Sequence, residues 1–144
     1  MKKVICLYRL SPSEQEVGKP DIKMQKLACM NFISQMEDWS FYSEYIEKCE
    51  PSNDTSVNMK DSIVKIRKKA ERNEFDVLLV YSFDRLGSTE MEVPLIENWF
   101  MKNGIEIWSV REGRKNPITQ DEWKKYFDRF LLGKVDGEKP SERI

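Results

Sequence analysis

Val77-Leu78-Leu79-Val80-Tyr81 forms the centre of residues 75–83, the clearest strand pattern in the sequence. The run has an apolar or aromatic side chain at every position, so it offers no polar face to water. A strand of this kind is typical of the middle of a parallel sheet whose two faces are both covered by helices. We therefore expect strands and helices to alternate on either side of it.

Three other segments have the pattern of strands. Residues 4–8 are a short apolar run followed by loop residues, residues 41–46 are a weaker candidate, and residues 105–110 follow Gly104. Helical spacing of apolar residues separates and follows these strands. The predicted helices cover residues 21–37, 58–72, 92–103 and 119–132.

The helix ends carry recognisable signals. Asp21 and Asn58 are candidate N-caps, and Gly104 is a candidate C-terminal residue of the third helix. The apolar residues of the first helix recur at i, i+3, i+4, i+8 and i+12; they are Met24, Leu27, Ala28, Phe32 and Met36.

Alternation of this kind predicts an α/β fold. We expect a three-layer domain with a mostly parallel sheet of four to five strands flanked by helices. The domain should cover residues 1–133, and residues 134–144 have the composition of a polar tail.

The composition narrows the class of protein. Of the 144 residues, 40% are apolar and 34% are charged, which suits one soluble domain. No apolar run reaches the ~20 residues that a membrane helix needs, so we expect a cytoplasmic protein with no membrane partner.

The residue types that are absent limit the possible chemistry. The chain has no histidine, which excludes histidine-based triads and histidine-ligated zinc. The cysteines Cys6, Cys29 and Cys49 lack metal-ligand spacing, so we expect buried or idle thiols. Catalysis would use hydroxyl, carboxylate, guanidinium or ammonium groups, without a metal or a cofactor.

Polar side chains follow the predicted strands, where ligands of parallel sheets bind. They include three hydroxyls, an amide, two arginines and two carboxylates. The residues are Arg9, Ser11 and Gln15 after the first strand, Glu47 after the second, and Ser82, Asp84, Arg85 and Ser88 after the third.

Two motifs at these strand ends resemble those of the resolvase/invertase serine recombinases. Residues 9–15 read R-x-S-x-x-x-Q, which is similar to the opening motif of that family. Residues 84–87 read D-R-L-G and resemble its second hallmark, a strand ending in D-R-L-[GS]. Residues 105–112 look like the fourth strand of the family. The likeness spans about residues 3–112 and implies a resolvase-like catalytic domain.

The resemblance also implies a reaction, the cleavage and rejoining of DNA through a phosphoserine intermediate. Ser11 matches the nucleophile, Arg9 matches a phosphate-binding arginine, and Gln15 matches a polar residue of the same loop. Asp84 and Arg85 match the Asp-Arg pair of the family. Guanidinium groups suit this reaction because negative charge develops on the nonbridging phosphate oxygens.

Other positions depart from the family pattern. Glu47 falls near the family's acidic residue but is one methylene longer, and Lys60 and Ser88 stand where arginines are usual. Leu7 replaces a tyrosine, and Tyr8 should point to the opposite face of the strand. Losing one preorganised donor typically costs ~10²–10³ in rate, so activity is expected to be weak or lost. The alternative is an inactive recombinase-fold protein that serves as a DNA-associated or protein-interaction module.

The resemblance implies that DNA is the partner, in a prokaryotic cytoplasm. Family members carry a DNA-recognition module after a long helix, and we expect none in this chain. The aromatic face of residues 119–132 should pack on the sheet or on a second copy, which would give a homodimer or tetramer. A third hypothesis, from another class, makes Glu47 and Asp84 a magnesium site for phosphoryl transfer.

Overall fold

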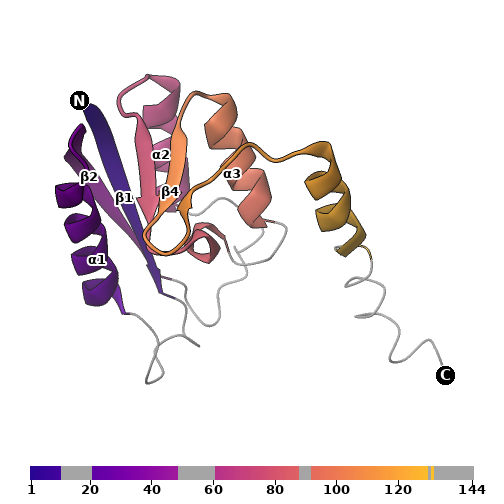
Figure 1. The fold of residues 1–144 in the computed structure, drawn as a ribbon, viewed down its shortest axis with the longest axis horizontal. Helices are drawn as coiled ribbons and strands as arrows, with labels where there is room; N and C mark the ends of the chain where they lie inside the picture. Colours follow the sequence, from indigo (N-terminus) through magenta and orange to yellow (C-terminus); the bar gives the residue numbers. More distant parts are fainter. Residues whose placement is uncertain (11–20, 49–60, 88–91, 130, 132–144) are drawn as a thin grey trace.

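The computed structural model describes residues 1–10, 21–48, 61–87, 92–129 and 131. Its centre is a five-stranded sheet in the order β2-β1-β3-β4-β5 (Figure 1). Strands β1 to β4 are parallel, which confirms the predicted sheet, and only the short β5 runs antiparallel. The strands are β1 Lys2–Leu10, β2 Trp39–Lys48, β3 Val77–Val80, β4 Glu106–Ser109 and β5 Gly113–Arg114.

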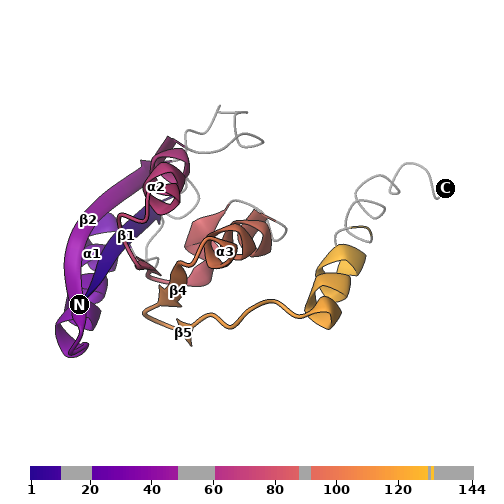
Figure 2. The same ribbon diagram turned by 90° about the horizontal axis from the view of Figure 1, so that it is seen from above.

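Helices cover the two faces of the sheet, as Figure 2 shows from above. Helix α1 lies on one face, and α2 and α3 lie on the other. The predicted strand over residues 75–83 is too long at both ends, and at its C-terminal end a short 3-10 helix, η3, follows after Tyr81 and Ser82. The bounds are α1 Ile22–Gln35, α2 Asp61–Glu71, η3 Phe83–Leu86 and α3 Glu92–Lys102.

Strand β1 divides its side chains between two apolar clusters. Ile5 and Leu7 pack with α2 and α3, whereas Cys6 and Tyr8 pack with α1. This alternation is what a central strand requires when both faces are covered. It confirms that Leu7 and Tyr8 point to opposite faces.

Helix α1 begins as the sequence predicts, but only the second half of its predicted apolar stripe packs against the core. The Asp21 carboxylate accepts a 2.8 Å hydrogen bond from the Met24 amide, which confirms the N-cap. Met24 and Leu27, however, are exposed. The helix instead buries Gln25, Cys29 and Ile33, so a polar side chain heads the buried face.

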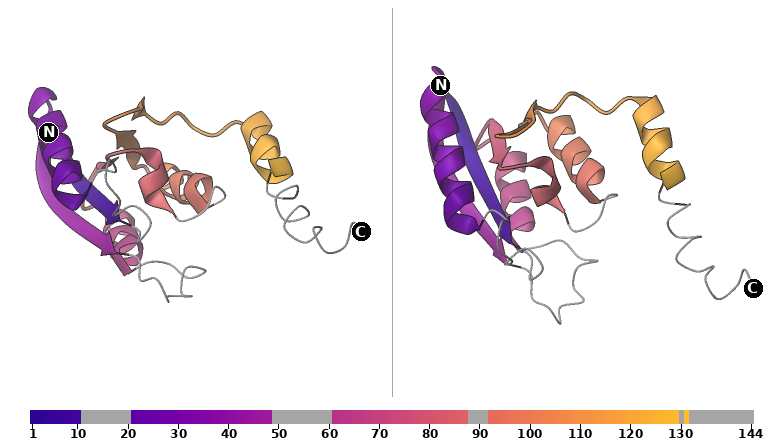
Figure 3. Two further views of the ribbon diagram at one scale, coloured as in Figure 1. Left: turned by 90° about the horizontal axis from the view of Figure 1, so that it is seen from below. Right: turned by 60° about the horizontal axis from the view of Figure 1, so that its bottom comes forward.

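The aromatic helix near the C-terminus stands apart from the sheet. Residues 120–129 are helical, and the Thr119 hydroxyl accepts a 3.1 Å hydrogen bond from the Glu122 amide in a capping box. The ribbon views place this helix beyond α3 (Figures 1 and 3). Trp123 and Tyr126 contact each other edge to face, while Phe127 is 55% exposed. This helix therefore does not pack on the sheet, which was one of its two expected packing partners.

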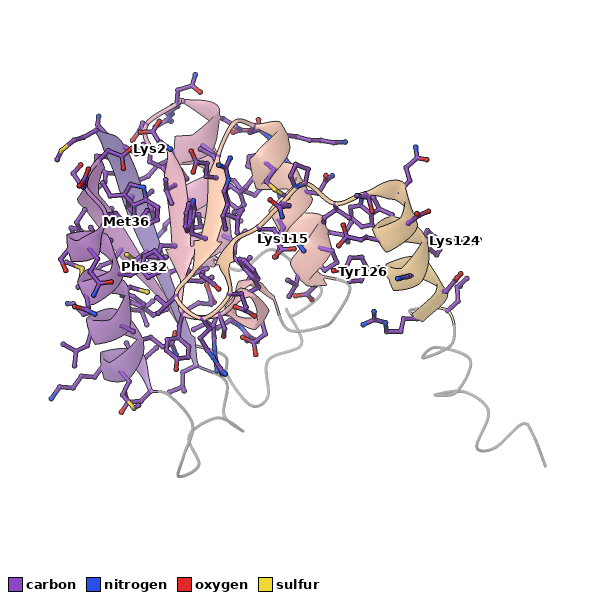
Figure 4. The ribbon with its side chains drawn as sticks, in the orientation of Figure 1. Lys2, Phe32, Met36, Lys115, Lys124 and Tyr126 are labelled. Carbon is purple, nitrogen blue, oxygen red and sulfur yellow. The ribbon has the colours of Figure 1, made fainter. Side chains whose placement is uncertain are left out.

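Glu97 of α3 is a buried carboxyl group close to the segment that leads to this helix. Its Oε1 lies 4.0 Å from Nζ of Lys115, which Figure 4 shows beside α3. Burial raises the pKa of Glu97 to about 7; Lys115 opposes the shift, and Glu112 and Glu122 add to it. Glu97 therefore holds a proton in the folded state at pH values where an ordinary carboxyl has lost it.

We expect stability to fall as the pH rises from about 5 to about 8. Between the ordinary pKa of 4.5 and about 7, the folded protein binds more protons at Glu97 than the unfolded chain does. The loss is at most about 3 kcal/mol, is absent below the ordinary pKa and is complete about one pH unit above the folded-state pKa, near pH 8. Glu97→Gln should flatten this dependence in denaturation experiments, while Glu71→Gln, at an exposed position of α2, should not. An equally steep dependence in Glu97→Gln would contradict this prediction.

No helix among the described residues has the length and apolar character that crossing a lipid bilayer demands.

Candidate active site

Arg9 lies within β1, near its end at the carboxyl edge of the sheet, rather than after the strand as the sequence predicts. It follows Ile5 and Leu7 at alternate positions, so its side chain belongs to the face covered by α2 and α3. It is 7% exposed, and Glu47 of β2 is its partner in the strand register. The motif arginine is thus a largely buried group held by a central strand, which sets it apart from a solvated surface arginine.

Helix η3 carries the Asp-Arg pair to the same edge. The Arg85 amide donates to the Ser82 carbonyl, which turns the chain immediately after β3. The Ser82 hydroxyl bonds the Asp84 carboxylate, and Nε of Arg85 lies 3.6 Å from the same Asp84 oxygen. Asp84 is largely exposed at its side chain, whereas the Arg85 side chain is only 5% exposed. The pair therefore presents a buried guanidinium beside an accessible carboxylate.

The two arginine-bearing segments are in direct contact. Nη1 of Arg85 donates a 3.4 Å hydrogen bond to the backbone carbonyl of Arg9, although 76 positions separate them in the chain. The carboxyl ends of β1 and β3 meet here because these strands are neighbours in a parallel sheet. The fold thus brings together Arg9, Asp84 and Arg85, as the sequence predicts.

Glu47 occupies a somewhat different place from the one predicted. It lies within β2 rather than after it, and its Oε1 accepts a 3.2 Å hydrogen bond from the Ser62 amide in the first turn of α2. The Ser62 hydroxyl also donates to the carbonyl of Ile46. Glu47 therefore holds the N-terminus of α2 against the sheet, next to Arg9.

Two further polar side chains support this edge and were missed in the sequence. Oε1 of Glu112 accepts hydrogen bonds from the Phe83 amide at 3.1 Å and from the Ser109 hydroxyl at 2.5 Å. Glu112 thereby ties the segment after β4 to the first residue of η3. Gln25 of α1 bonds the backbone of Arg9. Both act on backbone groups of other elements, a role for which a single sequence has no local pattern.

Tyr8 does not take the place of the tyrosine that Leu7 replaces. Its hydroxyl donates a 2.9 Å hydrogen bond to Glu44, which in turn pairs with Lys26 at 3.1 Å. Burial raises the pKa of Tyr8, so the phenol stays neutral. It lies on the α1 side of the sheet, on the opposite face from Arg9.

The remaining predicted site residues, Ser11, Gln15, Lys60 and Ser88, lie outside the described residues. Ser11 follows Arg9 by two positions, and Ser88 follows Arg85 by three. Of the thiols, Cys6 and Cys29 are buried and free, and Cys49 is outside the described residues. Within the described part of the chain, no three Cys, Asp or Glu side chains are grouped to hold a metal ion.

Comparison with known proteins shows which family model the chain matches and which solved structures share its fold. The family described as "Resolvase, N terminal domain" matches residues 4–137. No curated protein matches the chain.

Three similar solved structures illustrate the shared fold. A resolvase family site-specific recombinase from Streptococcus pneumoniae has a TM-score of 0.70 at 15% identity, over 100% of both chains. The N-terminal catalytic domain of TP901-1 integrase has 0.63 at 19%, over 95% of this chain and 98% of that one. A serine recombinase from Sulfolobus solfataricus has 0.54 at 19%, over 99% and 91% respectively.

Proposed function

Since the chain belongs to the resolvase family and carries its N-terminal catalytic domain, we propose that it cleaves and rejoins DNA strands through a phosphoserine intermediate. One observation carries the proposal. Two buried arginine-bearing segments, which end β1 and follow β3, meet at the carboxyl edge of the sheet, and Ser11 comes two residues after Arg9. A phosphate bound there would lie among cationic groups held by the fold.

In the proposed step, the Ser11 oxygen attacks the phosphorus of a DNA phosphodiester. A bond forms between this oxygen and phosphorus, the bond to the 3′-oxygen breaks, and the serine proton is lost as the 3′-hydroxyl gains one. The energy of the phosphodiester is kept in the phosphoserine bond, so a 3′-hydroxyl can reverse the step on another strand. No metal or cofactor takes part.

The charged groups have separate proposed roles. Arg9 and Arg85 bind the phosphate and stabilise the charge that develops on its nonbridging oxygens, because guanidinium groups are planar and can donate two parallel hydrogen bonds. Asp84 orients Arg85, from which it is 3.6 Å away. Gln15, Glu47, Lys60 and Ser88 are supporting positions.

The experiment uses supercoiled plasmid DNA that carries a candidate recombination site. The chain should become attached to the DNA in a complex that survives denaturation by detergent, and peptide mapping should place the bond at Ser11. Absence of any attached complex with the intact chain, over a range of candidate sites, would contradict the proposed activity.

We also propose that the chain forms dimers, or tetramers built from them, through residues 119–132. The support is the exposed Phe127 and the position of this helix beyond α3 (Figure 4). Sedimentation should show a dimer whose population rises with concentration. Phe127→Asp should weaken it at least about tenfold, because burying a phenylalanine side chain contributes about 1.5–3 kcal/mol. Lys124→Asp, a charge change at another exposed position of the helix, should leave the dimer intact. A monomer at all concentrations would contradict this assignment.

A further inference from the structure

Gln25 is a buried amide on a helix face that is otherwise apolar. Its side chain is fully buried, and the next residues on that face are Cys29 and Ile33. A buried amide is costly unless its donor and acceptor are both satisfied. The hydrogen bonds of Gln25 therefore explain why a polar residue heads this face.

Both groups of the amide bond the backbone of one residue. Oε1 of Gln25 accepts from the Arg9 amide at 3.1 Å, and Nε2 donates to the Arg9 carbonyl at 2.9 Å. Strand β3 ends at Val80, which lies opposite Leu7, so no β3 residue pairs with Arg9. The side-chain amide supplies a donor and an acceptor as a neighbouring strand would.

The same carbonyl links Gln25 to the second arginine. The Arg9 oxygen accepts from Nε2 of Gln25 and from Nη1 of Arg85. The carboxylate of Asp21 caps the N-terminus of α1, the helix that carries Gln25. Three segments, α1, β1 and η3, are thus connected at one backbone oxygen.

We propose that Gln25 is a positioning residue for DNA cleavage, which acts by fixing the backbone of Arg9 and, through its carbonyl, Arg85. This inference rests on the proposed function. It requires that Gln25 touch neither DNA nor the reacting atoms, so its loss should slow the chemical step more than it weakens DNA binding.

The first test compares Gln25→Ala with Cys29→Ala, a buried position one turn along the same helix face. Gln25→Ala should lower the single-turnover rate of adduct formation about 10–100-fold at saturating DNA, since small misplacements of catalytic groups cost up to ~10² in rate. Its apparent Kd for DNA should change less than about threefold. Cys29→Ala should lower thermal stability and leave the rate per folded molecule unchanged. Equal rate losses in both variants would overturn the positioning role.

A second variant keeps the volume of the side chain. In Gln25→Glu, an ionised carboxylate can accept from the Arg9 amide but cannot donate to its carbonyl, whereas the protonated form offers one donor and one acceptor again. Its cleavage rate relative to the wild type should therefore recover as the pH is lowered through the pKa of this carboxyl, which burial raises as it does that of Glu97. A ratio that is independent of pH would contradict this role.

Amide hydrogen exchange separates this inference from the proposed function. The Arg9 amide should exchange at least about tenfold faster in Gln25→Ala, while the Leu7 amide stays protected. If the wild-type chain forms no adduct, the proposed function fails, and exchange alone decides whether Gln25 holds Arg9. Unchanged exchange at Arg9 would overturn the inference in either case.

Discussion

Replacing Ser11 by alanine is expected to abolish covalent attachment of the chain to DNA. Alanine has no oxygen that could bond to phosphorus, so the loss should be complete rather than partial. DNA binding should be nearly unchanged, because the substitution removes a single hydroxyl and leaves Arg9 and Arg85 in place. The measurement is the fraction of DNA in a detergent-resistant complex, at protein concentrations where both variants bind equally.

The matched control for this experiment is Ser13→Ala. Ser13 lies two positions further along the same segment and has the same side chain, but it does not match the nucleophile of the family motif. Ser13→Ala should retain the adduct. Adduct formation by Ser11→Ala, or its loss in both variants, would contradict the assignment of Ser11 as the nucleophile.

Much of the fold could be predicted because local patterns determine it. The continuous apolar run at Val77–Val80 fits a strand buried on both faces, and the structure confirms it as a central parallel strand. The Asp21 cap was visible because capping depends only on residues within one turn. The short β5 and the end of β3 at Val80 could not be predicted in this way. Tyr81 and Ser82 continue the apolar and polar pattern of the strand, but the Ser82 carbonyl accepts a hydrogen bond from Arg85 of η3.

The buried face of α1 shows where local patterns fail. Met24 and Leu27 have the spacing of a core-facing stripe but are exposed, because the helix turns Gln25 toward the sheet, where its side chain accepts a hydrogen bond from the Arg9 amide. That backbone is available only because β3 stops short of it. A side chain whose partner is a distant main-chain group leaves no periodic signal in the sequence.

The same distinction, between residues with a local pattern and residues with distant main-chain partners, applies to the candidate site. Arg9 and Arg85 could be predicted to lie together because both stand at the carboxyl ends of strands that belong in the middle of one parallel sheet. Gln25 and Glu112 could not, since their partners are the main chain of Arg9 and the amide of Phe83. The family motifs identify the groups that we propose to bind the phosphate, whereas the groups that hold these motif residues in place emerge only from the fold.

Lys60 and Ser88 stand where the family motifs usually have arginines, and restoring both arginines is expected to have the second large effect on DNA cleavage. Ser88→Arg combined with Lys60→Arg is expected to raise the single-turnover rate of DNA cleavage by about 10² or more. A guanidinium supplies paired, planar donors that neither an ammonium nor a hydroxyl can supply, and one preorganised donor at a developing oxyanion is worth ~10²–10³ in rate. The gain should appear at saturating DNA, because these donors act most strongly on the charge of the transition state.

A general increase in positive charge must be distinguished from this effect. Lys65→Arg makes the same lysine-to-arginine change at an exposed position of α2 and should leave the cleavage rate unchanged. Adding Ser11→Ala to the double variant should remove all cleavage, which shows that the gain passes through the same nucleophile. A parent chain that already cleaves as fast as the double variant would contradict the expected gain. If both bind DNA and neither cleaves it, the site lacks more than two donors. The recombinase fold would then serve this chain as a DNA-associated or protein-interaction module, since restored guanidinium groups can only accelerate a step that the rest of the site still performs.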